Sequence, residues 1–223
     1  MSELFASAEL TAGQLNALVK NLMRQTQVDN PNEAVRLVNS GEWIVTKQTS
    51  SWREQDGVIH FSVTSDGTTG EAWITKLESK GFSVGDYAKQ VLRSPDFKPT
   101  SSVTTEVAVL KGTLFKNEDR ITKNIRAEAD TRKLSKPNAE MACLIREKFT
   151  DKEIEAMGLW YIVAMHEPIN DSDGYPNLLR TVRVGDGQWL GAYFDGPGGR
   201  WDSGGGFAFA VPQVQSSASE NES

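Results

Sequence analysis

The chain has 223 residues with 24 basic and 30 acidic side chains, which gives a formal net charge of −6 at neutral pH. Hydrophobic residues make up 38% and charged residues 24%, proportions that exclude bulk disorder and suit a folded globular chain. A protein that binds nucleic acid over its whole surface would have the opposite charge balance. The length suits one large domain or two small ones.

Cysteine and histidine are scarce. Cys143 is the single cysteine, which excludes an intramolecular disulfide and any zinc site built from several cysteines. His60 and His166 are the two histidines, so a histidine-rich transition-metal site is excluded as well. The first residues lack the basic and apolar regions of a signal peptide, and no apolar run reaches about 18 residues. We therefore expect a cytoplasmic protein with no membrane partner.

Two helices are predicted near the N-terminus. Thr11 and Gln14 have the spacing of a capping box, and Leu10 and Leu15 that of a hydrophobic staple. The helix that follows has an apolar stripe at helical spacing, formed by Leu15, Leu18, Val19, Leu22 and Met23. We interpret the stripe as a docking surface for the domain, with self-association as the alternative. A second helix is expected from Asn30-Pro31 to Gly41.

The middle of the chain alternates short strands and helices. Strands are predicted over 43–45 and 57–63, then a helix with a capping box at Thr68 and Glu71 that ends near Gly81. A helix over 83–92, stopped by Pro95, leads to a connector at 98–102. A strand over 103–110 and a charged helix over 117–134 follow.

The next helix is expected from Ser135 to Phe149, and Thr150 and Glu153 open a further short turn. The run 159–165 is the most hydrophobic of the chain and is typical of a strand buried on both faces. A last strand is predicted at 206–211.

Together these elements predict an α+β fold. We expect an N-terminal helix and strand region over 1–100, a C-terminal α+β domain over 103–213 and a disordered tail over 214–223. Whether the first two form separate domains or one core stays open at this point.

The sequence gives little evidence for a reactive thiol, a catalytic histidine or a metal site. Cys143 lies among apolar helix residues and is predicted to be buried and inert. His166 ends the hydrophobic strand, where a hydrogen-bonded histidine is the favoured interpretation and a hydrolase-type enzyme using His166 the alternative. Calcium could find oxygen ligands in acidic loops, although such loops are usually only solvated, so no metal and no cofactor is predicted; the residues considered are Glu167, Asn170, Asp171, Asp173 and Asp202.

Segment 116–136 is rich in positive charge. We interpret it as a solvated, ion-paired surface, with a nucleic-acid-associated regulatory protein as the alternative. Its basic residues are Lys116, Arg120, Lys123, Arg126, Arg132, Lys133 and Lys136.

The C-terminal segment offers the sharpest lead. Nine of the 19 glycines lie between Gly185 and Gly206, and Trp189 and Trp201 are the large side chains expected to anchor this stretch. Glycine adopts many backbone conformations, and aspartate, serine, tyrosine and arginine make adaptable contacts. The pattern indicates rigid anchors that hold a surface of tolerant positions.

Residues 187–213 read GQWLGAYFDGPGGRWDSGGGFAFAVPQ, and residues 159–171 read LWYIVAMHEPIND. These runs resemble a protein family of candidate-phylum bacteria and the variable region of diversity-generating-retroelement target proteins. The resemblance implies a C-type-lectin-like C-terminal part with display residues on a fixed backbone. Ile169 and Ser203 depart from the calcium-and-sugar motifs of true C-type lectins, so calcium-dependent sugar binding is not expected.

The leading hypothesis is a non-enzymatic protein that binds a protein or small-molecule ligand through a variable, glycine- and aromatic-rich surface. Aromatic and arginine side chains would supply most of the binding energy, as they do at interface hot spots. We expect no nucleic-acid partner. The predicted site residues are Arg183, Asp186, Gln188, Gly191, Tyr193, Phe194, Asp195, Arg200, Asp202 and Ser203.

Overall fold

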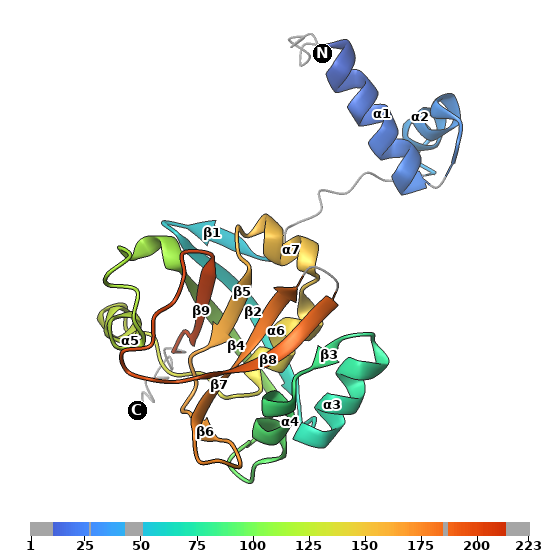
Figure 1. Cartoon of the computed structure of the whole chain (residues 1–223). Coiled ribbons are helices and arrows are strands. Elements are labelled where there is room, and N and C mark those ends of the chain that lie inside the picture. The colour runs from blue at the N-terminus through green and yellow to red at the C-terminus, as the bar shows by residue number, and fades with distance from the viewer. Residues whose placement is uncertain (1–10, 27, 43–50, 185–186, 213–223) are drawn as a thin grey trace, which may run out of the picture. The chain divides into compact units, whose positions relative to one another are not determined.

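The computed structural model describes residues 11–26, 28–42, 51–184 and 187–212. The chain divides into two units, Met1–Ser50 and Ser51–Ser223 (Figure 1). The predicted boundary at 98–102 is wrong, because strand β2 (Val58–Asp66) pairs along its length with strand β4 (Ser101–Lys111). Residues on both sides of that connector therefore belong to one sheet. The expected tail at 214–223 lies outside the described residues.

The first unit contains helices α1 (Ala12–Thr26) and α2 (Pro31–Asn39). The predicted capping box is confirmed: the Gln14 N–H donates to Thr11 Oγ1 at 3.3 Å, and Gln14 Oε1 accepts the Thr11 N–H at 2.9 Å. Asn30 caps α2, as expected. Leu15 and Leu18 are 50% and 47% exposed, so docking and self-association both remain predictions for this stripe. Leu10 and the strand expected at 43–45 lie outside the described residues.

The second unit is built on a nine-stranded sheet with the order β1-β2-β4-β9-β5-β7-β8-β3, and β6 pairs with β7. Neighbouring strands are antiparallel except for the pairs β5·β9 and β3·β8, which are parallel. The mixed sheet and its helices confirm the α+β class. The remaining strands are β1 (Arg53–Gln55), β3 (Ser83–Val84), β5 (Tyr161–Ala164), β6 (Ile169–Asn170), β7 (Pro176–Val184), β8 (Gly187–Phe194) and β9 (Gly205–Ala210).

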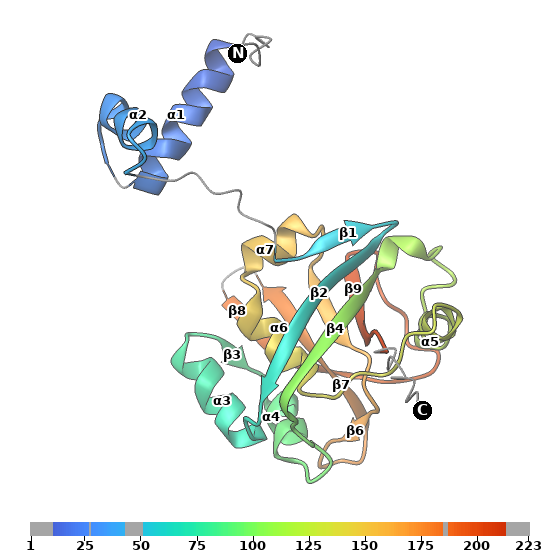
Figure 2. The ribbon, with the colours of Figure 1, turned by 180° about the vertical axis from the view of Figure 1, so that it is seen from behind.

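Both faces of the central strands are buried because alternate side chains enter two hydrophobic clusters. Ile162 and Ala164 of β5 pack into one cluster, and Tyr161 and Val163 into the other. All four residues of β5 are buried, as the hydrophobic run predicted. Helices α3 (Gly70–Ser79), α4 (Asp86–Arg93), α6 (Met141–Lys148) and α7 (Asp151–Ala156) contribute to the first cluster. Helix α5 (Thr122–Thr131) contributes to the second, and Figures 1 and 2 show it on the side opposite α3 and α4.

Helices α3 and α4 begin at later residues than predicted, because the residues before them make other hydrogen bonds. Thr69, not Thr68, caps α3: Thr69 Oγ1 accepts the Ala72 N–H at 3.4 Å, whereas the Thr68 hydroxyl donates to Asp66 Oδ1. Ser83 and Val84 form strand β3 rather than a helical turn, since they pair in parallel with β8. Helix α4 therefore begins at Asp86.

Two further helices are shorter than predicted because their flanks bridge to distant strands or loops. The charged helix covers only α5, since Ile121 pairs with Arg200 before it begins. Ser135 pairs with Ala210, so α6 starts at Met141 rather than at Ser135. A 3-10 turn, η1 (Gly112–Leu114), follows β4. The capping box at Thr150 of α7 is confirmed.

Within the described part of the chain, none of the helices has the length and apolar character needed to cross a bilayer.

Candidate functional site

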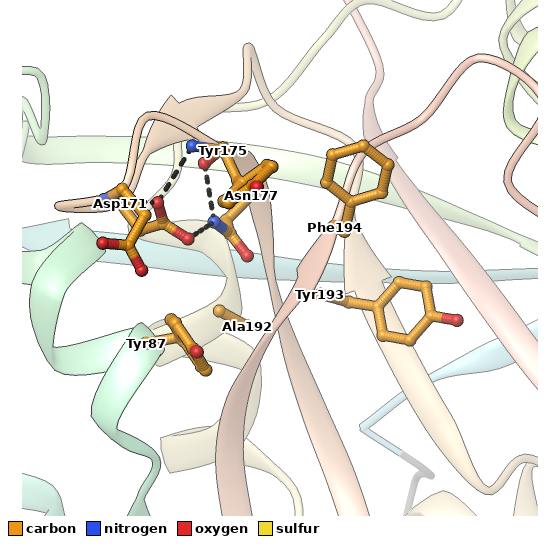
Figure 3. A pocket seen from close by; sticks show the side chains of 8 residues that line it. Tyr87, Asp171, Tyr175, Asn177, Ala192, Tyr193 and Phe194 are labelled. Carbon is orange, nitrogen blue, oxygen red and sulfur yellow. Dashed lines mark hydrogen bonds between the residues drawn. The ribbon is translucent and has the colours of Figure 1, made fainter.

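A pocket of about 480 Å³ opens beside α4, where the ends of β7 and β8 meet the turn between β6 and β7 (Figure 3). Tyr87 comes from the first turn of α4, and the β6–β7 turn supplies two aspartates and a tyrosine. We call this the aromatic pocket; its lining residues are Tyr87, Asp171, Asp173, Tyr175, Asn177, Ala192, Tyr193 and Phe194.

The β6–β7 turn is held by the carboxylate of Asp171. Asp171 Oδ1 accepts the N–H groups of Asp173 at 3.0 Å and Tyr175 at 2.9 Å, and Oδ2 accepts the side-chain amide of Asn177 at 3.0 Å (Figure 3). Gly174 adopts φ +83°, a conformation that a side chain would strain. Desolvation raises the pKa of Asp171, but the hydrogen bonds outweigh it and the net pKa lies below the ordinary value. The carboxylate is therefore ionised at neutral pH.

Three aromatic rings edge this pocket while remaining open to solvent. Tyr87, Tyr175 and Phe194 are 54%, 60% and 51% exposed. Tyr175 and Phe194 meet edge to face, with ring centroids 6.2 Å apart. Sequence reasoning missed Tyr87, Tyr175 and Asn177 as site residues because α4 and the β6–β7 turn are separated in the chain from the segment that was singled out. The glycine-containing turn at 171–175 was the available signal, since it had to lie at a strand end.

Tyr193 and Phe194 were expected on one binding surface, and both line the aromatic pocket, although their rings point in different directions. Consecutive strand residues point to opposite faces of a sheet, and Figure 3 shows the two rings leaving β8 in different directions. The ring of Tyr193 packs against Trp201 with centroids 4.8 Å apart, and the guanidinium of Arg180 lies 4.7 Å above it. Both residues line the aromatic pocket, and only the ring of Phe194 contacts another of its aromatic rings, that of Tyr175.

On the other face of β7 and β8, Arg180 lies against the aromatic rings of Tyr161 and Tyr193. Its guanidinium also lies 5.5 Å from the ring of Tyr161, and Gly191 is its partner on β8. Burial lowers the pKa of Arg180, and its Nε has no hydrogen-bond partner among the described residues. Burial, with a smaller contribution from the charge of Asp202, raises the pKa of Tyr161 to about 12.

The side chains of Asp195 and Arg183 are engaged by other residues of the fold rather than free to contact a ligand. Asp195 is 7% exposed, and its carboxylate forms an ion pair with Arg126 at 2.8 Å. Arg183 donates to the carbonyl of Leu159 at 2.9 Å and pairs with Glu155 at 3.0 Å. Asp195 therefore joins the segment after β8 to α5, and Arg183 joins β7 to α7 and to the residues before β5.

The other predicted site residues are scattered. Gln188 pairs with Arg183 in the sheet, and Arg200 bridges to the residue before α5. Asp202 and Ser203 are exposed in the turn before β9, where Asp202 Oδ1 accepts the Gly204 N–H at 2.9 Å. Asp186 lies outside the described residues. Of the nine predicted positions that the structure describes, Tyr193 and Phe194 line the aromatic pocket and the other seven do not.

The glycines of this segment are mostly required by packing. A Cβ at Gly205 would lie 2.5 Å from the ring of Tyr161, at Gly204 2.6 Å from Trp160, and at Gly199 2.9 Å from a backbone oxygen. The expectation of tolerant positions is therefore wrong for these three, while Gly198 has open space.

The two tryptophan anchors also differ. Trp201 is 6% exposed and donates its indole N–H to Thr122 Oγ1 at 3.0 Å, which confirms it as an anchor. Trp189 is 37% exposed, so the expectation that it anchors the segment is wrong.

His166 is buried at the end of β5, as predicted. The Leu179 N–H donates to its Nε2 at 3.0 Å, so the ring proton resides on Nδ1 and is donated to the carbonyl of Glu167 at 2.6 Å. Burial lowers the pKa of His166 to about 4. With both nitrogens engaged by backbone, the imidazole has no lone pair left to act as a general base, which weakens the hydrolase alternative.

Cys143 is fully buried, and burial raises the pKa of its thiol, in keeping with the predicted inert role.

The basic segment is largely neutralised by its own contacts. Arg120 is 7% exposed and donates to the carbonyls of Gly112 and Phe115. Arg132 pairs with Glu128, Lys136 with Glu167, and Arg126 with Asp195. Four of the seven cations are thus engaged by the fold, which reduces the charge that could meet a polyanion.

The oxygen-rich residues considered for calcium do not gather. In the described ranges, no three aspartate, glutamate, histidine or cysteine side chains lie together as metal ligands.

Comparison of the chain with protein-family models, with curated proteins and with solved structures finds no match.

Proposed function

We propose that this is a non-enzymatic binding protein and that the aromatic pocket is its ligand site. The observation that carries the proposal is the convergence of Tyr87, Tyr175 and Phe194, from three separate segments, on one pocket. Its volume of about 480 Å³ lies within the range of small-ligand sites. Large exposed rings leave apolar area in water, and a ligand that covers them removes this cost.

The polar groups of the pocket suit recognition better than catalysis. Asp171 is committed to three hydrogen bonds that shape the turn, and Asn177 is buried and bonded to the same turn. The described walls bring no histidine, cysteine, serine or lysine to the pocket. A pre-shaped turn beside adaptable rings can orient a ligand without reorganisation.

The test is a titration of the full chain with two small probes, choline and its uncharged isostere 3,3-dimethylbutan-1-ol, followed by NMR of the aromatic protons. We expect resonances of Tyr87, Tyr175 and Phe194 to shift with at least one probe, and Phe194→Ala to weaken that binding severalfold. Trp160→Ala is the matched control, because Trp160 is 61% exposed and lies outside the pocket. Absence of shifts at the pocket rings with both probes, or equal losses in the two variants, would contradict the proposal.

The resemblance to lectin-like retroelement targets adds a second part to this proposal: a few positions of the C-terminal segment are diversified. Diversification would be confined to positions with room for a side chain, such as Gly191 and Gly198, because Gly199, Gly204 and Gly205 have none. The test is to sequence the DNA beside the gene in related isolates. An imperfect copy of the codons for 183–207, mismatched mainly at adenines and next to a reverse transcriptase, is the expected result. Its absence would remove diversification and leave the pocket as a fixed site.

A further inference from the structure

We infer that the aromatic pocket takes an organic cation, specifically an alkylated ammonium group, an inference that rests on the proposed function of the same pocket. Three observations on the lining residues carry it: the rings, the sign of the charges, and the state of the carboxylate oxygens.

The rings supply an electrostatic attraction that neutral apolar walls would not. The face of an aromatic ring carries partial negative charge and attracts a cation that comes within about 6 Å of its centroid. Tyr87, Tyr175 and Phe194 stand at different sides of the pocket, on α4, the β6–β7 turn and β8. The edge-to-face packing of Tyr175 and Phe194 leaves ring surface available, since both remain more than half exposed.

The formal charges of the pocket are all negative. Asp171 and Asp173 line it, and no lysine or arginine does so among the described residues. Neither aspartate forms an ion pair with a described residue, whereas Asp195, which follows β8, is paired with Arg126. A cationic ligand would supply the counter-charge that the fold does not provide.

The occupied oxygens of Asp171 favour a cation that needs no direct hydrogen bond to this carboxylate. A carboxylate has about four acceptor positions, and three of those on Asp171 already take N–H groups from its own turn. A guanidinium would donate two parallel hydrogen bonds to one carboxylate, and on Asp171 most of the acceptor positions for such a pair are already occupied. A metal ion would need further ligands that do not cluster in the described ranges. An alkylated ammonium needs no direct hydrogen bond, only ring faces and nearby negative charge.

The experiment compares choline with 3,3-dimethylbutan-1-ol on the full chain by NMR titration. The two probes have nearly the same shape and differ in charge, so their ratio of dissociation constants isolates the electrostatic part. We expect choline to bind about threefold to tenfold more tightly, the range of an exposed to partly desolvated cation–π site. Added salt should raise the dissociation constant of choline toward that of the neutral probe, whose own dissociation constant should not change.

Two variants locate the effect. Phe194→Leu keeps apolar volume but removes the ring, and Asp173→Asn removes one charge; both should weaken choline severalfold with little change for the neutral probe. Asp119→Asn, an exposed carboxylate outside the pocket, is the matched control and should change neither.

The outcomes separate the two claims. Equal binding of the two probes at the pocket rings would overturn the cation inference and leave the proposed function standing. Binding of neither probe at those rings would overturn both.

Discussion

The substitution Gly205→Ala tests whether the glycine-rich segment is a packed part of the fold or a tolerant display surface. An added Cβ would lie 2.5 Å from the Cζ and Oη atoms of Tyr161, well inside van der Waals contact. Tyr161 is 5% exposed, its ring lies 6.1 Å from that of Trp201, and its backbone pairs with Gly205 itself. The ring therefore cannot move aside without disturbing the second hydrophobic cluster.

The expected cost follows from overpacking. Forcing an extra methyl group into a filled site destabilises the folded state by about 1–3 kcal/mol. Replacing glycine by alanine also lowers the conformational entropy of the unfolded chain, which stabilises the protein by about 0.4–1 kcal/mol. The difference is a net loss of unfolding free energy of at most about 2.6 kcal/mol, and we expect about 1–2 kcal/mol because the Tyr161 ring is held by its neighbours. For a domain of this size that corresponds to a fall in Tm of about 2–8 °C.

Thermal and urea unfolding of the full chain, followed by circular dichroism, measure this loss. Gly198→Ala is the control, because nothing lies within 4 Å of the added Cβ, and its Tm should stay level or rise slightly. If the two variants unfold at the same temperature, the packing argument is refuted and position 205 is as tolerant as a variable surface would require.

Three further predictions concern buried groups. His166 stays neutral in the fold down to a pKa of about 4 while the unfolded chain takes up a proton near pH 6.5, so stability should fall by about 3 kcal/mol as pH drops through that window. Urea unfolding at pH 7 and 4.5 should show this loss in the native sequence and a smaller one in His166→Gln; parallel losses would refute it. Arg126→Ala leaves the carboxylate of Asp195 buried without its partner and should cost about 2–3 kcal/mol, part of which Asp195→Asn recovers. Strictly additive losses in that double-mutant cycle would contradict the pairing. Cys143 should resist a thiol reagent in the native protein and react fully in denaturant, so rapid native labelling would show that the thiol is accessible.

Features decided within a few residues could be predicted from the sequence. The capping boxes at Thr11 and Thr150 depend on two side chains three positions apart, and the buried strand β5 depends on one unbroken hydrophobic run. The inert Cys143 and the hydrogen-bonded His166 followed in the same way from their immediate neighbours. Local chemistry is sufficient where the competing conformations differ only in local contacts.

The aromatic pocket was decided by tertiary structure. Phe194 could be singled out, but its partners Tyr87 and Tyr175 lie far away in the chain and meet it only because β8 lies between β7 and β3 in the sheet. Long-range pairing also made Ser83 a strand residue, through β3·β8, and brought Tyr161 against Gly205, through β5·β9. A side chain's neighbours across a sheet are set by register and strand order, and these depend on the burial of the whole core rather than on any one segment.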